Sequence, residues 1–522
     1  MSHIHYVNIK QGSHSCERLS TGSTLPLTQR PFAMASFIPQ TDGRKDPWFF
    51  HPDDFSLEGI RLTHQPSPWI NDYGTLLITP QTGKPESTIG RAFSSYRPDK
   101  SILRPDKLCV TFDRYHATAT LTPTMRGAYF SVDYDDGGNK PFISFFPTLG
   151  NYGFRLDAKT DRLIGWNDGH SHDIAEQFRM YFVVQFEKGS VDVSKTQVFS
   201  KDIPCKEGIV VEGVGAGIHI ALRTNSIKAQ IAISYISEEQ ALENLRQESY
   251  PNGMSDALWE AKSDWEEHLS RIEVTCKEES QLRTFYSCLY RCFLFPHAAY
   301  EYTSDGEAIH YVPSTGGIGK GKRFVDIGFW DVYRTLFPLF SLIAKDEYAQ
   351  MLEAFVQDYK ECGWLPRWTS IGEVGCMPST LIDAVIADAV VKDIGDKSLW
   401  EDALSGMIHH ANTAAPESCY GRTGVDAYLR YGYIPYDVVN PSVNLTLDAA
   451  YGDFCIAQVA KTLGHREIEE EYRGRSLNYR HLFDEKTGFM RAKDSDGRFA
   501  ESFNPFAWGG PYCESSAWQA TF

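Results

Sequence analysis

Tryptophans and carboxylates recur as close neighbours in the C-terminal half of this 522-residue chain. The neighbours are Trp330 and Asp331, Trp364 and Trp368 near Glu373, and Trp508 and Trp518 on either side of Glu514. A single tryptophan is more often a core residue than a ligand contact. Repeated pairing of tryptophan with a carboxylate indicates a sugar site. Aromatic rings cover the apolar C–H faces of a sugar, and carboxylates accept hydrogen bonds from its hydroxyls. Cleaving a glycosidic bond also needs two carboxyl groups, one protonated and one ionised. The pattern is therefore typical of a protein that binds or cleaves sugars.

Two other motifs are weak evidence for a nucleotide site and a metal site. Gly316-x-x-x-x-Gly321-Lys322 resembles a phosphate-binding loop. However, Arg323 replaces the Ser or Thr that would bind magnesium, and we predict no strand leading into the loop. We therefore expect a flexible loop, or a loop at the rim of a ligand site, in place of a nucleotide site. The pair His409–His410 lies on a predicted helix without a second pair of ligands, so we do not expect a metal there.

Net charge, apolar segments and cysteine spacing limit the partners and the location expected for this chain. The net charge is −17 and the isoelectric point is near 5.4, so the surface should repel nucleic acids and anionic membranes. The first 15 residues contain no apolar signal segment, and no run of 18 apolar residues predicts a membrane span. The eleven cysteines are scattered without C-x-x-C pairs. Together these features predict a reduced, cytoplasmic protein with neither nucleic acid nor membrane as partner.

The first 236 residues read as strands separated by turns. Segments such as Lys107–Leu121, Phe178–Phe186 and Gln230–Ile236 are rich in Val, Ile, Tyr, Phe and Thr. Many short strands at this spacing predict a β-sandwich over residues 1–236. Ser237-x-x-Gln240 is a capping-box pattern, and it opens a predicted helical linker over residues 237–275.

Apolar residues at helical spacing dominate residues 276–522. The predicted helices are Glu279–Phe295, Phe329–Ile343, Asp346–Glu361, Thr380–Ile394, Leu399–Ala411, Val443–Leu463 and Arg466–Leu482. Gly395 and Gly464 follow helix ends, where a left-handed residue is favoured. Seven helices are too few for the six helix pairs of a closed (α/α)6 toroid. We therefore expect a multidomain β plus α chain that ends inside an incomplete toroid.

Four stretches, in order along the chain, resemble glycoside hydrolase family 92, the calcium-dependent exo-acting α-mannosidases. They are Gly59–Pro80, Asp326–Ile343, Gly363–Ala389 and Asn504–Gln519. Their order over nearly the whole chain makes chance a poor reason for the similarity.

The resemblance implies roles for particular residues of the helical half. Glu514 matches the glutamic acid that protonates the leaving oxygen. Asp331 matches the aspartate that holds mannose in the −1 subsite, with Trp330 before it and Arg334 one turn along. Residues of these types also have structural uses, since an acid such as Asp331 at the start of a helix is favoured by the helix dipole.

The remaining implied sugar-binding residues come from both halves of the chain. Trp69 and His64 match the sandwich loop that forms part of the pocket, and Trp364 and Glu373 would line the helical side. Trp69 could instead pack a turn, and Glu373 could be a solvated loop charge.

By resemblance, the complete protein would hydrolyse terminal α-linked mannose, with α-1,2 linkage expected, from mannose-containing oligosaccharides such as N-glycans. Hydrolysis would proceed with inversion and would need Ca²⁺. The family's base and most of its calcium ligands follow the acid-bearing segment, so we expect a truncated chain with no metal ligands of its own. Two alternatives stay open: a glucoside-acting hydrolase or phosphorylase of the same architecture, and a non-catalytic glycan-binding protein.

Overall fold

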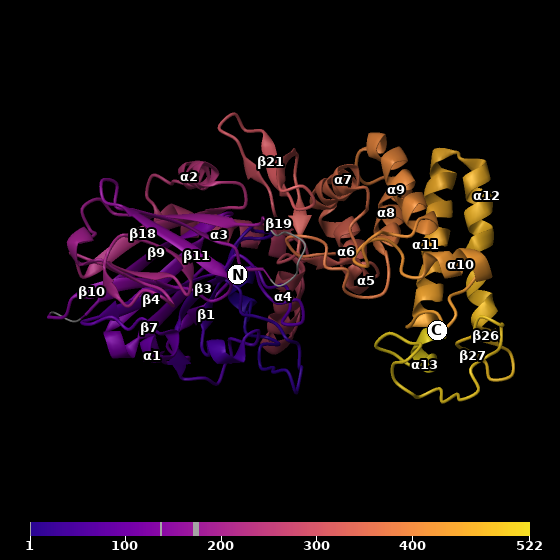
Figure 1. Cartoon of the computed structure of the whole chain (residues 1–522), viewed down its shortest axis with the longest axis horizontal. Helices are drawn as coiled ribbons and strands as arrows, with labels where there is room; N and C mark the ends of the chain where they lie inside the picture. Colours follow the sequence, from indigo (N-terminus) through magenta and orange to yellow (C-terminus); the bar gives the residue numbers. More distant parts are fainter. Residues whose placement is uncertain (1, 136–137, 171–176, 522) are drawn as a thin grey trace. The chain divides into compact units, whose positions relative to one another are not determined.

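A computed structural model describes residues 2–135, 138–170 and 177–521 (Figure 1). The chain divides into two compact units, residues 1–321 and residues 322–522. No helix in the described ranges combines the length and apolar character needed to cross a membrane.

The first unit is built on two antiparallel sheets, which appear in indigo and magenta in Figure 1. In its described residues, one sheet has seven strands in the order β1 (Ser36–Gln40), β3 (Gly59–Thr63), β4 (Leu76–Thr82), β10 (Pro141–Phe146), β17 (Gly217–Ala221), β14 (Gln197–Phe199) and β15 (Lys206–Glu207). The other has nine strands in the order β16 (Val210–Val214), β11 (Asn151–Asp157), β12 (Arg162–Asn167), β13 (Met180–Phe186), β18 (Ser226–Ser234), β9 (Gly127–Tyr134), β8 (Ala117–Pro123), β7 (Leu108–Phe112) and β6 (Ile102–Leu103).

Apolar side chains pack between the two sheets, which confirms the predicted β-rich N-terminal fold. Phe145 of β10 lies 6.5 Å from Phe154 of β11, measured between ring centroids, and both residues are buried. Strand β10 is buried at every position because the outer face of its sheet is covered too. There, Phe146 packs with Ala92 of helix α1 (Ile89–Ala92). Burial on both faces favours a continuous apolar strand over strict alternation.

Helix α2 (Glu238–Gln247) covers the outer face of the nine-stranded sheet, where Ala241 and Leu245 pack on Val183. The predicted N-cap is present, since the Ser237 side chain accepts a hydrogen bond from the Gln240 backbone amide at 3.1 Å. The Gln240 side chain instead donates to Asn244 Oδ1 and Tyr302 O. Helices α3 (Met254–Leu269) and α4 (Glu279–Cys292) complete the helical part of this unit.

The expectation that the chain is helical throughout residues 276–522 is wrong for residues 301–320. Strands β20 (Glu301–Tyr302), β21 (Ala308–Val312) and β22 (Gly317–Lys320) form an antiparallel sheet. Gly316, with φ of 69°, makes the turn between β21 and β22, and Val312 pairs with Gly317. The glycines that resembled a phosphate-binding loop therefore belong to a hairpin, and the expected flexible loop is wrong as well.

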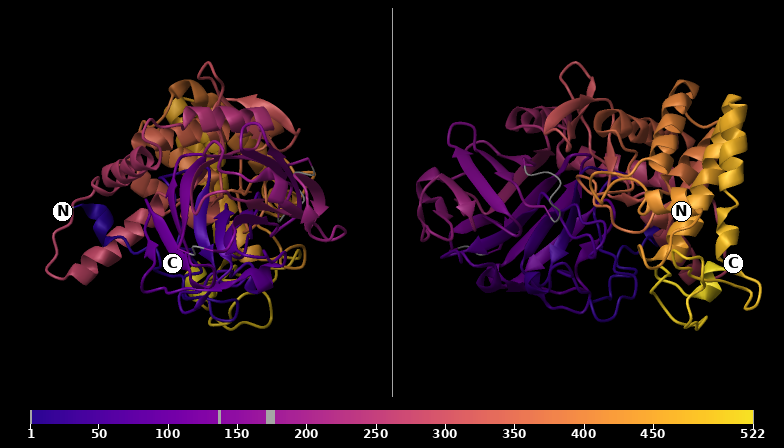
Figure 2. Two further views of the ribbon diagram at one scale, coloured as in Figure 1. Left: turned by 90° about the vertical axis from the view of Figure 1, so that its left-hand side faces the viewer. Right: turned by 45° about the vertical axis from the view of Figure 1, so that its right-hand side comes forward.

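The second unit consists mainly of helices. Its described helices are α5 (Phe329–Val332), α6 (Leu336–Ile343), α7 (Lys345–Cys362), α8 (Ile382–Val391), α9 (Trp400–Asn412), α10 (Val425–Tyr431), α11 (Ser442–Leu463), α12 (Arg466–Arg475) and α13 (Ala517–Ala520). Helices α11 and α12 run side by side in both figures (Figures 1 and 2). Gly464, with a φ of 83°, caps α11 as predicted, whereas Gly395 has a φ of 102° but lies beyond the end of α8, which stops at Val391 and not at the predicted Ile394.

Three helix predictions differ from the structure. The helix predicted over Phe329–Ile343 is two helices, α5 and α6. Pro338 lies in the first turn of α6, where its missing amide hydrogen costs no intrahelical bond, whereas a continuous helix would have placed it in the interior. The helix predicted over Arg466–Leu482 ends at Arg475. Helix α10 was not predicted, because Gly424 and Gly432 confine it to seven residues.

Helix α11 runs through the centre of the helical unit and contacts α8, α9 and α12. Beside it, the buried Arg422 guanidinium donates to Asp453 Oδ1 at 2.7 Å and to Asp383 Oδ2 at 2.9 Å. Gly452 leaves the space for this pair, since a Cβ there would lie 2.6 Å from Arg422 Nη2. The glycine in a helix interior therefore has a packing reason.

We predict that Arg422→Ala destabilises the helical unit by about 3–5 kcal/mol, because it leaves the buried Asp383 carboxylate without its cation and Asp453 with Arg475 alone. Urea unfolding monitored by tryptophan fluorescence measures this free energy. Arg466→Ala is the matched control, since it removes an exposed ion pair with Glu470 and should change stability little. Equal effects of the two substitutions would contradict a structural role for Arg422.

Candidate active site

Glu514 lies in a segment that is held at several points of its backbone. Pro511 O accepts a hydrogen bond from Val443 N–H at 3.0 Å, and Cys513 N–H donates to Asn444 Oδ1 at 2.8 Å. Both partners lie in the first turn of α11. Glu514 itself is exposed and has a φ of 45°, a left-handed conformation that is sparsely populated by residues other than glycine. The surrounding hydrogen bonds maintain that conformation and present the carboxyl group to solvent.

Asp331 lies in the first turn of α5 and accepts a hydrogen bond from Trp368 Nε1 at 3.2 Å. Strands β24 (Ile327–Gly328) and β25 (Trp368–Thr369) set this contact, since Gly328 pairs with Trp368. A Cβ on Gly328 would lie 1.9 Å from Trp368 Nε1, so the indole reaches Asp331 only because residue 328 is glycine. The Asp331 side chain remains accessible to solvent, although protein surrounds much of it.

Glu373 supports the same strand through its backbone. Its carboxylate accepts hydrogen bonds from the backbone amides of Trp368 at 2.6 Å, Arg367 at 2.9 Å and Gly375 at 3.3 Å. Burial raises the pKa of Glu373 to about 7, against the opposing effect of these amides. The side chain therefore orients β25, and with it the indole that holds Asp331. The alternative of a solvated loop charge does not describe this buried position.

Asp448 is a second carboxylate held by an indole. Its Oδ2 accepts a hydrogen bond from Trp330 Nε1 at 3.2 Å, across 118 residues of sequence. Burial raises the pKa of Asp448 to about 7, although the indole hydrogen bond and the charge of Arg334 act in the opposite direction. Asp448 lies one turn after Asn444 on α11, so both side chains share one helix face.

The charges of Asp331, Asp448 and Glu514 all act on the thiol of Cys513, the residue before Glu514. Burial raises the pKa of the Cys513 thiol to about 11, and the charges of Glu514, Asp448 and Asp331 add to the rise. Burial also raises the pKa of Asp331, with a further contribution from Glu514. Because such effects weaken with distance, the three acids lie in the neighbourhood of Cys513. The arrangement can donate a proton and accept hydrogen bonds from the hydroxyls of a ligand.

The other residues predicted in the helical half have different surroundings. Trp364 is buried and packs against His409, His410 and Tyr420, with ring centroids 4.4–6.3 Å away. Arg334 is exposed, and its guanidinium lies 5.4 Å from the ring centre of Tyr333. The charge of Arg334 also acts on Asp448, the carboxylate that Trp330 holds. Arg334 thus belongs to the surroundings of the site, whereas Trp364 contributes to an aromatic core.

His64 and Trp69 belong to the sandwich unit. His64 is fully buried, with Nδ1 2.8 Å from Tyr73 O and its ring stacked on Tyr73 at 4.7 Å. Trp69 is 60% exposed and meets Trp48 edge to face at 5.0 Å. A buried ion pair between Arg61 and Asp72 at 2.8 Å fixes the base of this loop. Trp69 therefore presents an aromatic face to solvent on a rigid support.

Sequence reasoning missed three residues of the site: Trp368, Asp448 and Asn444. Trp368 was noted beside Glu373, but nothing local connects it with Asp331. Asp448 and Asn444 have no sequence neighbour that signals a site. Their i, i+4 spacing on a predicted helix places them on one face, which was the available clue.

Among the described residues, no group of three Asp or Glu side chains brings its carboxylate oxygens within 4.8 Å of one another. Calcium takes six to eight oxygen ligands. Among the described residues, the one group of three side chains with convergent ligand atoms contains two histidines, His14 and His51, with Asp53. We therefore derive no catalytic step through calcium from these residues.

We predict that Asp448→Asn changes how stability depends on pH. The pKa of Asp448 is raised to about 7, so the folded chain keeps a proton that the unfolded chain loses near pH 4. The resulting stabilisation is complete below about pH 4 and is lost as the pH rises through about 7. Between these values the unfolding free energy of Asp448→Asn should fall less than that of wild type. Urea unfolding at a series of pH values measures the two slopes, and identical slopes would contradict the burial of this carboxyl group.

Comparison with known proteins identifies solved structures of mannosidases that resemble this chain. The chain is 30% identical to an inverting mannosidase of family GH92 from Bacteroides thetaiotaomicron, with a TM-score of 0.93, and the match covers 100% of this chain and 71% of that one. A GH92 α-mannosidase from the same organism is 24% identical with a TM-score of 0.87, at the same coverage. This second likeness shows the fold alone.

A curated relative corrects one expectation. The chain is 24% identical over 534 aligned residues to a protein of Arthroderma benhamiae described as an uncharacterized secreted glycosidase. The alignment spans 94% of this chain and 64% of that relative. The expectation of a cytoplasmic location is wrong, because this relative is described as secreted. The scattered cysteines had suggested a reducing compartment, but unpaired thiols do not specify a compartment. All eleven cysteines are free in the structure.

Two family matches cover nearly the whole chain. Residues 6–234 match the N-terminal domain of glycosyl hydrolase family 92. Residues 240–522 match the catalytic domain of the same family. The chain belongs to glycosyl hydrolase family 92.

Proposed function

We propose that this protein is an exo-acting α-mannosidase that hydrolyses terminal α-linked mannose with inversion. The observation that carries the proposal is that Asp331, Asp448 and Glu514 all lie near Cys513, with Asp331 and Asp448 each held by an indole N–H. Family membership supports it, as does the 30% identity with a protein described as an inverting mannosidase. The chain spans 64% of the curated relative's length, so the proposal concerns the complete protein.

In the proposed mechanism Glu514 protonates the leaving glycosidic oxygen. Asp331 accepts hydrogen bonds from hydroxyls of the mannose in the −1 subsite, and Trp368 holds the Asp331 carboxylate in place. Inversion also needs a carboxylate that activates water, about 6.5–9.5 Å from the acid. Resemblance to the family assigns that base to residues after the acid-bearing segment. Asp448 positions Trp330, whose ring we propose as a contact for the sugar.

The finer features of this function rest on family resemblance. We propose α-1,2-linked mannose of N-glycans as substrate, and roles in sugar binding, direct or through neighbours, for Trp69, His64, Arg334, Trp364 and Glu373. We propose the domain boundaries 1–236, 237–275 and 276–522. We also propose that the complete enzyme needs Ca²⁺, which chelation followed by calcium addition would test.

We predict that Glu514→Gln in the complete protein lowers kcat on α-mannosides with poor leaving groups by roughly 10²–10⁴-fold. The amide keeps hydrogen bonds but cannot supply the proton. An activated aryl leaving group needs less protonation, so its kcat should fall much less. Steady-state kinetics on both substrates measures the difference. Glu501→Gln, a change at an exposed acid nearby in sequence, is the control, and equal losses on both substrates would remove Glu514 from the acid role.

We predict that Asp331→Ala weakens the binding of a mannose-like inhibitor by about 1.5–3 kcal/mol, because a charged acceptor for its hydroxyls is lost. Inhibition constants measure this effect, and thermal unfolding measures any loss of stability. Asp346→Ala is the matched control, because Asp346 also lies exposed in the first turn of a helix. A large fall in melting temperature with unchanged inhibitor affinity would show that Asp331 has a structural role only.

A further inference from the structure

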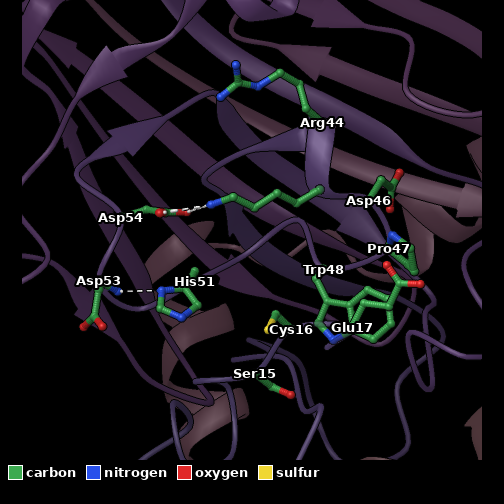
Figure 3. Close-up of a pocket in the computed structure, with 11 residues that line it drawn as sticks. Ser15, Cys16, Glu17, Arg44, Asp46, Pro47, Trp48, His51, Asp53 and Asp54 are labelled. Atoms are coloured by element: carbon green, nitrogen blue, oxygen red, sulfur yellow. Dashed lines mark hydrogen bonds and ion pairs between the residues drawn. The ribbon is translucent and has the colours of Figure 1, made fainter. Parts of the chain in front are cut away.

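A hollow lies in the sandwich unit, within the first 54 residues. It has a volume of about 820 Å³ and is lined by two short segments of chain, one containing Ser15 to Glu17 and the other running from Arg44 to Asp54 (Figure 3). His51 and Asp53 lie together on one side of the hollow, and Trp48 and Asp46 lie on another. None of the functional roles proposed above uses the histidine side of this hollow.

Three potential metal-ligand atoms converge beside the hollow, on the side that His51 and Asp53 line. His14, His51 and Asp53 each offer one atom, and these atoms lie within 4.8 Å of one another. His14 Nε2 is 2.9 Å from Asp53 Oδ2. The rings of His14 and His51 are 4.6 Å apart and tilted by 56°, so they do not stack face to face. His51 Nδ1 accepts a 3.3 Å hydrogen bond from the Asp53 backbone amide, which fixes the orientation of the imidazole ring.

The loop that carries His14 is fixed by its own hydrogen bonds. The His14 carbonyl accepts a hydrogen bond from the Thr21 hydroxyl, and Thr21 N–H donates to Ser15 Oγ at 3.1 Å. The ends of the loop cross at two glycines, since a Cβ on Gly22 would lie 2.8 Å from Gly12 Cα. His14 is exposed, but its backbone is therefore held in one position.

The segment that carries His51 and Asp53 is anchored to the sandwich. His51 N–H donates to Thr41 Oγ1 at 3.0 Å, and the same hydroxyl donates to Asp54 Oδ2 at 2.7 Å. Lys45 Nζ lies 3.3 Å from Asp54 Oδ1. The charge of Lys45 is thus taken up by Asp54, whereas Asp53 faces the two histidines.

We propose that His14, His51 and Asp53 bind a divalent transition-metal ion of the zinc class, with water in the remaining positions. Two imidazoles and one carboxylate are ligands that Zn²⁺ prefers, whereas calcium takes oxygen ligands. Tetrahedral Zn²⁺ with bonds of about 2.0–2.1 Å separates its ligand atoms by roughly 3.3 Å. The 2.9 Å contact between His14 and Asp53 needs to open by a few tenths of an ångström, and the exposed side chains allow this.

Other histidines beside carboxylates lack this convergence. His465 lies 3.0 Å from Glu401, but the group has no second histidine in the described part of the chain. His3 contacts two acids, but it uses Nδ1 for Glu266 and Nε2 for Glu273, so the acids lie on different sides of the ring. His465 and His3 are therefore suitable positions for control substitutions.

The test uses the chain without an affinity tag, stripped of metal and titrated with ZnCl₂ in a calorimeter. We expect one Zn²⁺ per chain. His14→Ala and His51→Ala should each weaken binding by more than about 100-fold, since even an outer partner of a metal ligand is worth about 10–100-fold. Titration with Co²⁺ in place of zinc should produce visible absorption in the wild type that is lost in both variants.

Further variants distinguish a specific site from zinc bound loosely by surface histidines. His465→Ala should bind zinc as the wild type does, and excess Ca²⁺ should not displace it. Circular dichroism of each variant establishes that it is folded. Asp53→Asn, which keeps the shape of the side chain, should also weaken binding. Absence of one-to-one binding by wild type, or wild-type affinity in a folded His14→Ala or His51→Ala variant, would overturn the proposal.

Discussion

The first turn of α11 determines where the acid-bearing segment lies. The first amides of a helix have no acceptor within the helix, so they seek one elsewhere. Val443 N–H donates a hydrogen bond to Pro511 O. In the same turn, Asn444 Oδ1 accepts a hydrogen bond from Cys513 N–H. One turn later, Asp448 meets Trp330 of α5. A single rigid helix therefore sets the separation between Glu514 and the residues around Asp331.

The carboxylates of the site are supported mainly by neutral donors. Indole N–H groups hold Asp331 and Asp448, and backbone amides hold Glu373. A neutral donor orients a carboxylate without cancelling its charge, whereas a lysine or arginine in contact would do both. Above about pH 7, where Asp448 and Glu373 are ionised too, the site therefore keeps a negative potential. Such a potential suits the oxocarbenium-like transition state of glycoside cleavage, in which positive charge develops on the sugar.

Much of the architecture could be predicted from local pattern, and the exceptions have physical causes. Strand-rich composition indicated the sandwich, and apolar spacing located most helices. Pro338 divided one predicted helix, and paired glycines made a hairpin where a loop was expected. The pairing of tryptophan with an acid in the sequence identified Trp330 and Asp331 as candidates. It could not identify the contact between Trp330 and Asp448, which are 118 residues apart. Only the folded chain brings such residues together, and the same holds for His14 with His51 and Asp53.

Glu373 and Trp364 illustrate a limit of transferring roles by position alone. Both were predicted to line the pocket, yet Glu373 is buried under three backbone amides and Trp364 packs among aromatic rings. Glu373 acts on the proposed site through a neighbour, by orienting Trp368.

A double-mutant cycle between Asn444 and Glu514 tests the central claim most directly, namely that α11 positions the proposed acid. The measured quantity is kcat of the complete protein on an α-mannoside with a poor leaving group. If Asn444 acts by holding the Glu514 segment, Asn444→Ala should lower kcat in the wild type and have almost no further effect in the Glu514→Gln background. Losses that simply multiply would contradict the account, because Asn444 would then act independently of Glu514.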